Sequence, residues 1–269
     1  MNQRKVQYGS LTVEISDDDV ARLRIGRLLN ENLVDFFLCK RVRENAADSG
    51  TTVVSTRWYS TLSEERRIAH ITELPSFVKD SFHVNFLDVQ HMHPEWFRSE
   101  FVFVPMNVNE NHWVLAVVIN RNASSLGSDS HRHCAIVLFD SHRDEQSPAL
   151  YDAVAHALRC FMNCEWYFRY VRASGKVVRE FTPETCPFIA CGIEQQSNGC
   201  DCGLYVIESC VTFLREMDDV KSHTSLTDGD IEWLRVYFSD KITVDGKSYR
   251  VELQNEVRTN VKDPVVDVL

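Results

Sequence analysis

A cysteine stands where a turn meets an apolar stretch in the run Gln-Ser-Asn-Gly-Cys-Asp-Cys-Gly, residues 196–203. The Asn-Gly pair at 198–199 is typical of a turn, and the apolar stretch 204–217 has the length and content of a buried helix. Cys202 would therefore lie at a helix N-terminus, where the positive end of the helix dipole favours a nucleophilic thiolate. Gly203 directly after it would leave room for a substrate. Taken alone, a cysteine in such a place is more often a buried structural thiol.

A nucleophilic cysteine needs a base and a third group that orients the base. Of the ten histidines, His112 directly precedes the apolar run 113–119, so a predicted strand would hold it near the surface. Asp140 directly follows a second predicted strand, 134–139. If the two strands pair as antiparallel neighbours, the start of one faces the end of the other, and His112 meets Asp140. Each residue alone would be an ordinary residue at a strand end.

An amide side chain near the nucleophile could stabilise the oxyanion that forms during acyl transfer, together with a backbone N–H. Gln196 lies six residues before Cys202 and is a candidate for this role. Gln195 stands next to it, and the residue types alone do not choose between the two glutamines.

Three β-rich apolar runs must position these groups, at 101–105, 113–119 and 134–139. Their apolar character is continuous rather than alternating, which predicts strands that are covered on both faces. The polar stretch 120–133 between the second and third runs predicts a hairpin connection.

Helices are predicted around this sheet, and no linker divides the chain, so we predict an α+β fold in one domain, 1–269. The segment 17–43 is predicted to be helical, with Asp17, Asp18 and Asp19 capping a first helix near Val20 and Asn30 capping a second. A loop at 45–52 and a mostly helical region from Trp58 towards Asp88 are predicted to follow. Later in the chain we predict a helix 147–162, a strand 166–171, a helix 226–238 and a tail without periodicity from about Arg258.

The composition excludes several classes of protein. The net charge of -10 argues against a nucleic-acid binder, because phosphate binding needs an excess of Lys and Arg, although it would suit a partner with a basic face. No run approaches the roughly 18 apolar residues of a membrane span, and no secretory signal opens the sequence. Nine cysteines, an odd number in a chain too large to need disulfides, indicate free thiols in the nucleus or cytoplasm.

The sequence resembles the ubiquitin-like-protein proteases, the sentrin/SUMO-specific group within the papain-like cysteine peptidases. The order His, Asp, Cys, with intervals of 28 and 62 residues, matches that family, and the similarity covers about residues 8–240. Three motifs carry the resemblance, and a weaker fourth supports it: 104–107 leading to 112–118, 137–141, 195–206 and, more weakly, 28–36.

The resemblance implies a papain-like α+β fold with a helical N-terminal part and a central mixed sheet flanked by helices. It also implies that Cys202 is the nucleophile, His112 the base, Asp140 the orienting acid and Gln196 the oxyanion donor.

The family also implies a narrow tunnel that admits a Gly-Gly tail. Trp113 would line this tunnel, although a core indole on a strand explains the residue equally well. Leu28 stands where the family has Trp or Phe, so the tunnel would close less tightly, and Gly203 would border the substrate. Two further departures are Glu31, which keeps the charge of the family's second Asp, and Cys200, which stands two residues before the nucleophile.

The implied function is cleavage after the C-terminal Gly-Gly of a ubiquitin-like modifier, which matures the modifier or removes it from its conjugates. SUMO is the first candidate for the modifier. The protein would act as a monomer without cofactor or metal. Its partners would be the modifier and its conjugates, with no nucleic acid or membrane. Three alternatives stay open: an acyltransferase with the same triad, an inactive modifier-binding module, and a zinc-stabilised interaction module using Cys186, Cys191, Cys200 and Cys202. No Cys-x2-Cys pair supports the zinc alternative.

Overall fold

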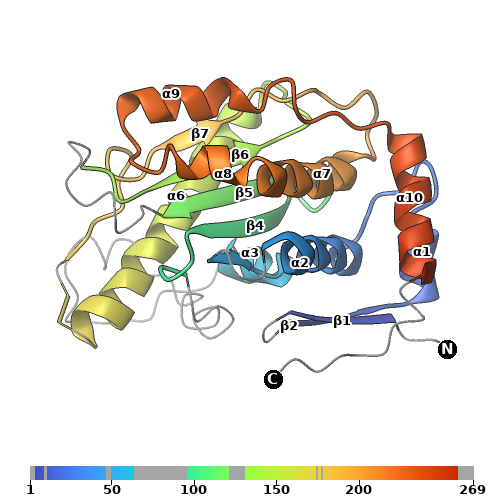
Figure 1. Cartoon of the computed structure of the whole chain (residues 1–269), viewed down its shortest axis with the longest axis horizontal. Helices are drawn as coiled ribbons and strands as arrows, with labels where there is room; N and C mark the ends of the chain where they lie inside the picture. Colours follow the sequence, from blue (N-terminus) through green and yellow to red (C-terminus); the bar gives the residue numbers. More distant parts are fainter. Residues whose placement is uncertain are drawn as a thin grey trace.

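A five-stranded mixed sheet lies between two layers of helices in the computed structural model (Figure 1), which describes residues 4–8, 11–46, 50–63, 96–120, 131–173, 175–176 and 178–259. The sheet order is β3-β4-β5-β6-β7, with bounds Thr51–Val53, Phe101–Val108, His112–Asn120, Cys134–Phe139 and Phe188–Ala190. A separate hairpin pairs β1 (Arg4–Tyr8) with β2 (Leu11–Ile15). The helices are α1 (Asp17–Ala21), α2 (Glu31–Ala46), α3 (Thr56–Ser63), α6 (Ser147–Trp166), α7 (Cys202–Arg215), α8 (Met217–Lys221), α9 (Asp228–Tyr237) and α10 (Gly246–Thr259), with a π-helical segment η2 (Tyr167–Arg172) after α6.

The three central strands are antiparallel, and the edge strands β3 and β7 run parallel to their neighbours. All three predicted strands are confirmed, and β4 and β5 extend beyond the predicted runs by a few residues. Pairing of β5 with β6 places Leu115 opposite Phe139. Asp140, the residue after β6, is thereby brought beside the first residues of β5.

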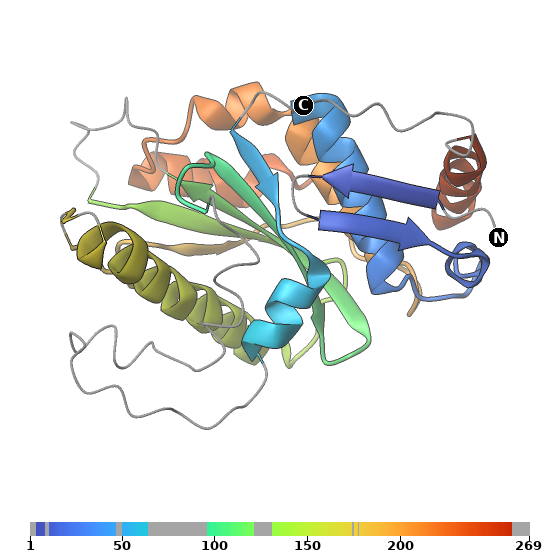
Figure 2. The same cartoon turned by 90° about the horizontal axis from the view of Figure 1, so that it is seen from below.

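Each central strand is buried on both faces. Alternate residues point to opposite sides of the sheet, so one set packs on α2 and α7 and the other on α3 and α6. Figure 2 shows α3 and α6 along one side of the sheet and α2 on the other. The first face includes Phe103, Leu115 and Val137, and the second includes Val104, Ala116 and Leu138. This double cover is the reason for the continuous apolar runs in the sequence.

Side-chain caps define several helix starts. Asn30 Oδ1 accepts from the backbone N–H of Leu33, as predicted for the second helix. Thr227 caps α9, which begins at Asp228 within the predicted helix 226–238. The first helix was misplaced, however: α1 begins at Asp17 and its N-cap is Ser16, which forms a capping box with Asp19.

Two predictions from local sequence were wrong. Residues 166–171 are not a strand, because α6 continues to Trp166 and then widens into η2. Aromatic content suggested a strand, but here the rings stack along a helical turn: Trp166 and Tyr170 have ring centroids 4.7 Å apart. The predicted loop 45–52 also contains the start of β3, where Thr51 pairs with Phe101.

The C-terminal helix α10 was not anticipated from the sequence. It runs to Thr259, past the point near Arg258 where the tail was predicted to begin. In Figure 1 it stands at one end of the molecule, beside α1. Most of the predicted 120–133 connection, the helical region beyond Ser63 and the tail beyond Thr259 lie outside the described residues. Within the described part of the chain, none of the helices has the length and hydrophobicity needed to cross a membrane.

Candidate active site

Cys202 is the first residue of α7, two residues earlier than the predicted helix start. Its side chain is buried, with 1 % of the residue exposed. Asp201 occupies the N-cap position, and its carbonyl accepts from the backbone N–H groups of Leu204 and Tyr205. The thiol therefore lies at the positive end of a 14-residue helix, as the turn signal before it predicted.

His112 and Asp140 meet across the paired strands, as the sequence predicted. His112 Nε2 lies 2.8 Å from Asp140 Oδ1. The carboxylate is fully buried and accepts two further hydrogen bonds, from the backbone N–H of His142 at 2.9 Å and from Tyr151 Oη at 2.9 Å. Burial alone would raise the pKa of Asp140, but the hydrogen bonds from His112 and His142 outweigh it and hold that pKa below its usual value.

His112 lies between this carboxylate and the Cys202 thiol. Burial by itself lowers the pKa of His112, but the hydrogen bonds with Asp140 and Cys202 outweigh burial and raise it to about 9. The imidazole therefore carries a proton at neutral pH. A thiol, an imidazole and a buried carboxylate in this order form the arrangement that activates a cysteine for acyl transfer.

The structure distinguishes the two adjacent glutamines. Both hydrogens of Gln195 Nε2 are used, one donated to the Asp140 carbonyl at 3.1 Å and one to the Ile193 carbonyl at 3.0 Å. Gln196 accepts from Ser141 Oγ at 2.9 Å and donates one hydrogen of Nε2 to the Asn198 carbonyl. Its other amide hydrogen has no acceptor within the described residues, which favours Gln196 as the oxyanion donor.

Tyr151 was missed in the sequence. It lies near the start of α6, within the predicted helix 147–162, and its hydroxyl donates to the second oxygen of Asp140. The negative charge of Asp140, added to burial, raises the pKa of Tyr151 to about 12. The position on α6 was the only available signal, because nothing in local sequence connects Tyr151 with Asp140.

The predicted substrate-binding residues form one packed group around Leu29. The indole of Trp113 is almost completely buried, and its N–H donates to the Leu29 carbonyl at 2.9 Å. Leu28 is half-buried against the same core. The burial of Trp113 agrees with the core interpretation of this residue, which holds the Leu28–Leu29 segment in place.

The sequence suggested that Gly203 leaves room for a substrate, but the structure shows no open space at this position. A Cβ at this position would lie 2.9 Å from Leu29 Cβ and 3.1 Å from Leu29 Cδ1. The glycine is therefore needed because Leu29 packs directly on the first turn of α7.

Replacing Gly203 by alanine is expected to lower the free energy of unfolding by about 1–3 kcal/mol, the usual cost of overpacking a core. In an unobstructed helix the same change would stabilise by up to about 1 kcal/mol, so the sign of the effect tests the contact. Chemical denaturation measures it.

Gly199→Ala provides a matched control, because a Cβ at Gly199 meets nothing within 4 Å. It should leave the free energy of unfolding within about 0.5 kcal/mol of the wild type. A Gly203→Ala protein as stable as the wild type would show that Leu29 yields without cost.

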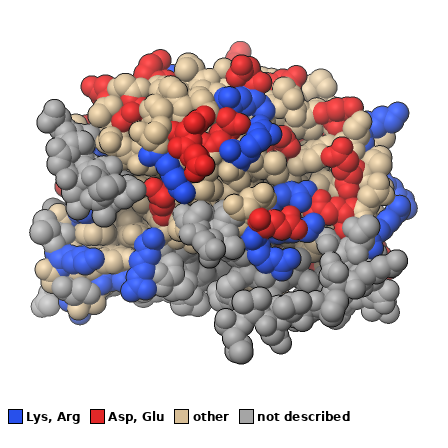
Figure 3. Space-filling model, viewed as in Figure 1, with Lys and Arg blue, Asp and Glu red and all other residues tan. Residues whose placement is uncertain are grey.

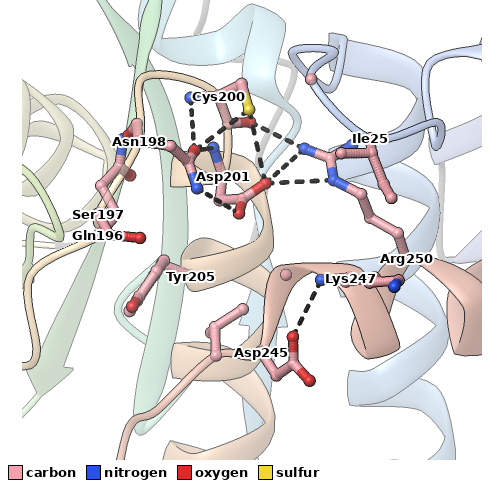
Figure 4. Close-up of a pocket in the computed structure, with 13 residues that line it drawn as sticks. Ile25, Gln196, Ser197, Asn198, Cys200, Asp201, Tyr205, Asp245, Lys247 and Arg250 are labelled. Atoms are coloured by element: carbon pink, nitrogen blue, oxygen red, sulfur yellow. Dashed lines mark hydrogen bonds and ion pairs between the residues drawn. The ribbon is translucent and has the colours of Figure 1, made fainter.

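Two pockets border the candidate site. One, of about 430 Å³, is lined by Gln196, Asp201 and Tyr205 among others and is shown in Figure 4. The other, of about 710 Å³, is lined by His112, His142 and several residues that precede or begin α6. Acidic and basic side chains are interspersed on the face seen in Figure 3, so the described part of that face has no single basic field.

A metal centre was one of the alternatives raised by the cysteines. Within the described residues, no group of three or more His, Cys, Asp or Glu side chains could hold a metal ion. Cys191 Sγ donates instead to the Leu234 carbonyl, and Cys186 lies against Cys134 with the sulfur atoms 3.0 Å apart.

Comparison with known proteins agrees with this geometry. The family model described as "Ulp1 protease family, C-terminal catalytic domain" matches residues 27–247. The chain belongs to the Ulp1 protease family. Its described residues have the helices and central mixed sheet of the predicted α+β, papain-like fold, and the matched part of the chain is a cysteine protease domain.

Individual members of the Ulp1 family are distant in sequence. "Ubiquitin-like-specific protease 2" of Schizosaccharomyces pombe is 24 % identical over 238 residues, which are 80 % of this chain and 35 % of that protein. The chain spans between about a fifth and about a half of the length of the curated relatives it matches.

Solved structures share the Ulp1-family fold. A "de-sumoylating protease" aligns with a TM-score of 0.65 at 17 % identity, over 96 % of this chain and 91 % of the other. The C-terminal Ulp1 protease domain in complex with "SMT3, the yeast ortholog of SUMO", aligns with a TM-score of 0.51 at 17 % identity, over 97 % and 90 % of the two chains.

Proposed function

We propose that this chain cleaves after the C-terminal Gly-Gly of a ubiquitin-like modifier, with SUMO as the first candidate, and so matures the precursor or releases the modifier from substrate lysines. The observation that carries the proposal is the position of His112, in contact with both the Cys202 thiol and the Asp140 carboxylate. The names of the curated relatives support the class of substrate, since they describe proteases of ubiquitin-like proteins.

In the first step, the Cys202 thiolate attacks the carbonyl carbon of the terminal glycine, while its proton resides on His112. A C–S bond forms, and the carbonyl oxygen becomes an oxyanion. The remaining hydrogen of Gln196 Nε2 and the backbone N–H of Cys202, which faces outward at the start of α7, are the donors that we assign to this oxyanion.

In the second step, the C–N bond breaks and His112 gives its proton to the leaving amine. The pKa of about 9 suits this role, because the imidazole is protonated at neutral pH before the reaction begins. Water then attacks the thioester, His112 takes the proton of that water, and the Cys202 thiolate leaves. The buried Asp140 carboxylate holds the imidazole in one orientation throughout.

The Gly-Gly requirement is a matter of space. Leu29 fills the volume above Gly203 and Trp113 holds Leu29 from behind, so this side of the site is rigid. We propose that the tail passes along this wall, where a substrate residue with a Cβ would meet side chains that have no room to retreat and glycine is selected by steric exclusion. Leu28, where the family resemblance implies an aromatic residue, would cover the tail less completely.

The remaining parts of the proposal concern the whole molecule. One core cluster extends from Val13 to Val257, which supports a single peptidase domain over residues 1–269. We propose a monomer without cofactor or metal, acting in the nucleus or cytoplasm on the modifier and its conjugates, with neither nucleic acid nor membrane as a partner.

A panel of modifiers that each carry a C-terminal vinyl sulfone tests this function. SUMO, ubiquitin and other ubiquitin-like modifiers are incubated with the chain, and covalent adducts are mapped by mass spectrometry. We expect one modifier to be captured at Cys202, and SUMO to be captured fastest. The same modifier ending in Gly-Ala should react far more slowly, because of the steric exclusion described above.

Two results would contradict the proposal. Capture that survives Cys202→Ser would assign the reaction to another residue. Tight binding of a modifier without capture or hydrolysis would instead identify a binding module, the alternative left open by the sequence.

A further inference from the structure

Arg250 of α10 is the largest charged side chain that is almost completely buried in the described part of the chain, with 2 % exposed. It lies beyond residue 247, where the family match ends, and beyond residue 240, where the sequence resemblance ends. A buried guanidinium needs several acceptors, because its donors lose their contact with water. The acceptors of the Arg250 guanidinium belong to two separate loops, one of which leads directly to the nucleophile.

One set of acceptors belongs to the loop before Cys202. Arg250 Nε and Nη2 donate to Asp201 Oδ1 at 3.1 and 2.7 Å, and Nη2 also donates to the Cys200 carbonyl at 3.0 Å. Figure 4 shows the guanidinium directed at Asp201 and Cys200. Arg250 thus holds the two residues that directly precede the nucleophile.

The other set belongs to the loop that leads to Leu28. Nη1 of Arg250 donates to the carbonyls of Arg22 and Arg24 at 3.2 and 3.1 Å, and Nη2 donates to the Arg27 carbonyl at 2.8 Å. A single planar guanidinium therefore joins the nucleophile loop to the loop that precedes Leu28.

The Asp201 carboxylate cannot easily move away from this bond. Its other oxygen, Oδ2, accepts from Asn198 Nδ2 at 2.8 Å. Gly246, the first residue of α10, lies so close that a Cβ there would be 2.1 Å from Asp201 Oδ2. The carboxylate is thus enclosed by the nucleophile loop on one side and by the first turns of α10 on the other.

Helix α10 is itself fixed to the rest of the fold. Glu256 accepts from Lys40 Nζ at 2.7 Å and forms a bidentate pair with Arg41 at 2.6 and 3.0 Å, both residues of α2. Gln254 Nε2 donates to the Leu23 carbonyl at 2.9 Å. Arg250 is therefore anchored on a rigid support when it holds the two loops.

We propose that Arg250 is a positioning residue for the reaction: it sets the place of the Cys202 thiol relative to His112, and the place of the Leu28 segment relative to the thiol. This inference rests on the proposed function and deepens it, because it assigns part of the geometry of the site to a residue of α10 that lies beyond the family match. Arg250 acts through Asp201 and the loop carbonyls, and does not itself touch the reacting atoms.

The test compares Arg250→Gln and Arg250→Lys with Arg258→Gln, the same chemical change at an exposed arginine of the same helix. We expect Arg250→Gln to lower kcat for precursor cleavage by about tenfold to a hundredfold, the size of effect that a misplaced reacting group produces, with KM changed less. Arg250→Lys, which keeps the charge but not the planar fork, should fall between that variant and the wild type. Arg258→Gln should match the wild type.

A second measurement does not depend on any modifier. The rate of Cys202 alkylation by iodoacetamide should fall in Arg250→Gln, with rates expressed per folded molecule from circular dichroism. If the wild type cleaves no modifier, the proposed function fails, but these alkylation rates still decide whether Arg250 positions the thiol.

If Arg250→Gln does not fold, Gly246→Ala takes its place, because the added methyl displaces the Asp201 carboxylate while Arg250 remains. It should lower kcat and the alkylation rate in the same direction. The inference is overturned if a folded Arg250→Gln or Gly246→Ala protein has the kcat and alkylation rate of the wild type, or if activity falls only in proportion to the folded fraction.

Discussion

Replacing Cys202 by alanine is expected to lower kcat for cleavage of a modifier precursor by about 10⁶-fold. The loss is this large because no other group can form the thioester, and the remaining members of a triad contribute little without the nucleophile. The side chain is small and buried at the start of α7, so the fold should be retained. Precursor cleavage followed by gel electrophoresis, with thermal unfolding measured in parallel, checks both expectations.

Cys200→Ala is the matched control, since it removes a thiol two residues away in the same loop. The Cys200 thiol is only partly buried, and it contacts Asn198 rather than His112. The variant should retain most of the activity. If Cys200→Ala abolished cleavage and Cys202→Ala did not, the assignment of the nucleophile would be wrong.

Replacing Asp140 by asparagine is expected to lower kcat by about 10²- to 10⁴-fold, because the imidazole loses the charge that orients it and stabilises its protonated form. The substitution should also shift the pH dependence of the reaction. The hydrogen bond and charge of Asp140 raise the pKa of His112, so their loss lowers that pKa from about 9. The imidazole would then lose the proton that the leaving amine needs at a lower pH than in the wild type. The alkaline limb of the kcat/KM profile should therefore shift to lower pH. A pH–rate profile from pH 6 to 10 measures both effects.

Tyr151→Phe separates charge from hydrogen bonding at the same carboxylate. It removes the donor to Asp140 Oδ2 but leaves the negative charge that faces His112. Its alkaline limb should stay near that of the wild type, with a smaller loss of kcat. An Asp140→Asn enzyme whose alkaline limb does not move would show that Asp140 does not control the protonation of His112.

The positions of the proposed catalytic residues could be predicted from sequence because secondary structure alone brings two of them together. His112 begins one buried strand and Asp140 follows the next strand along the chain, so antiparallel pairing is sufficient to place them in contact. Cys202 could be predicted because turn residues and an apolar helix mark its position at a helix start. In each case the signal lies within a few residues of the functional group.

The choice between the two glutamines could not be made in this way. Both have the same side chain, and the difference is that Gln195 is saturated by the carbonyls of Asp140 and Ile193. Ile193 is a local partner, but Asp140 becomes a neighbour of Gln195 only when the end of β6 and the segment before α7 lie side by side. Tyr151 and Arg250 escaped prediction for the same reason, since their partners are distant in sequence.

Propensity failed where tertiary packing decided the local structure. The aromatic residues of η2 favour a strand by composition, but Trp166 stacks on Tyr170 and Arg179 lies over the Trp166 ring, 4.4 Å from its centroid. Gly203 was interpreted as an opening for substrate because the position of Leu29 above it depends on α2 and β5 together.

The hairpin of β5 and β6 carries His112 and Asp140 at one end, and the connection between the two strands leaves from the other end, at Asn120. A strand of nine residues separates these ends by roughly 26 Å at the usual rise per residue. A change in the length of that connection would therefore lie far from His112 and Asp140. For protein engineering, the same separation makes this end of the hairpin suitable for inserting an affinity tag or a fluorescent reporter into an active enzyme.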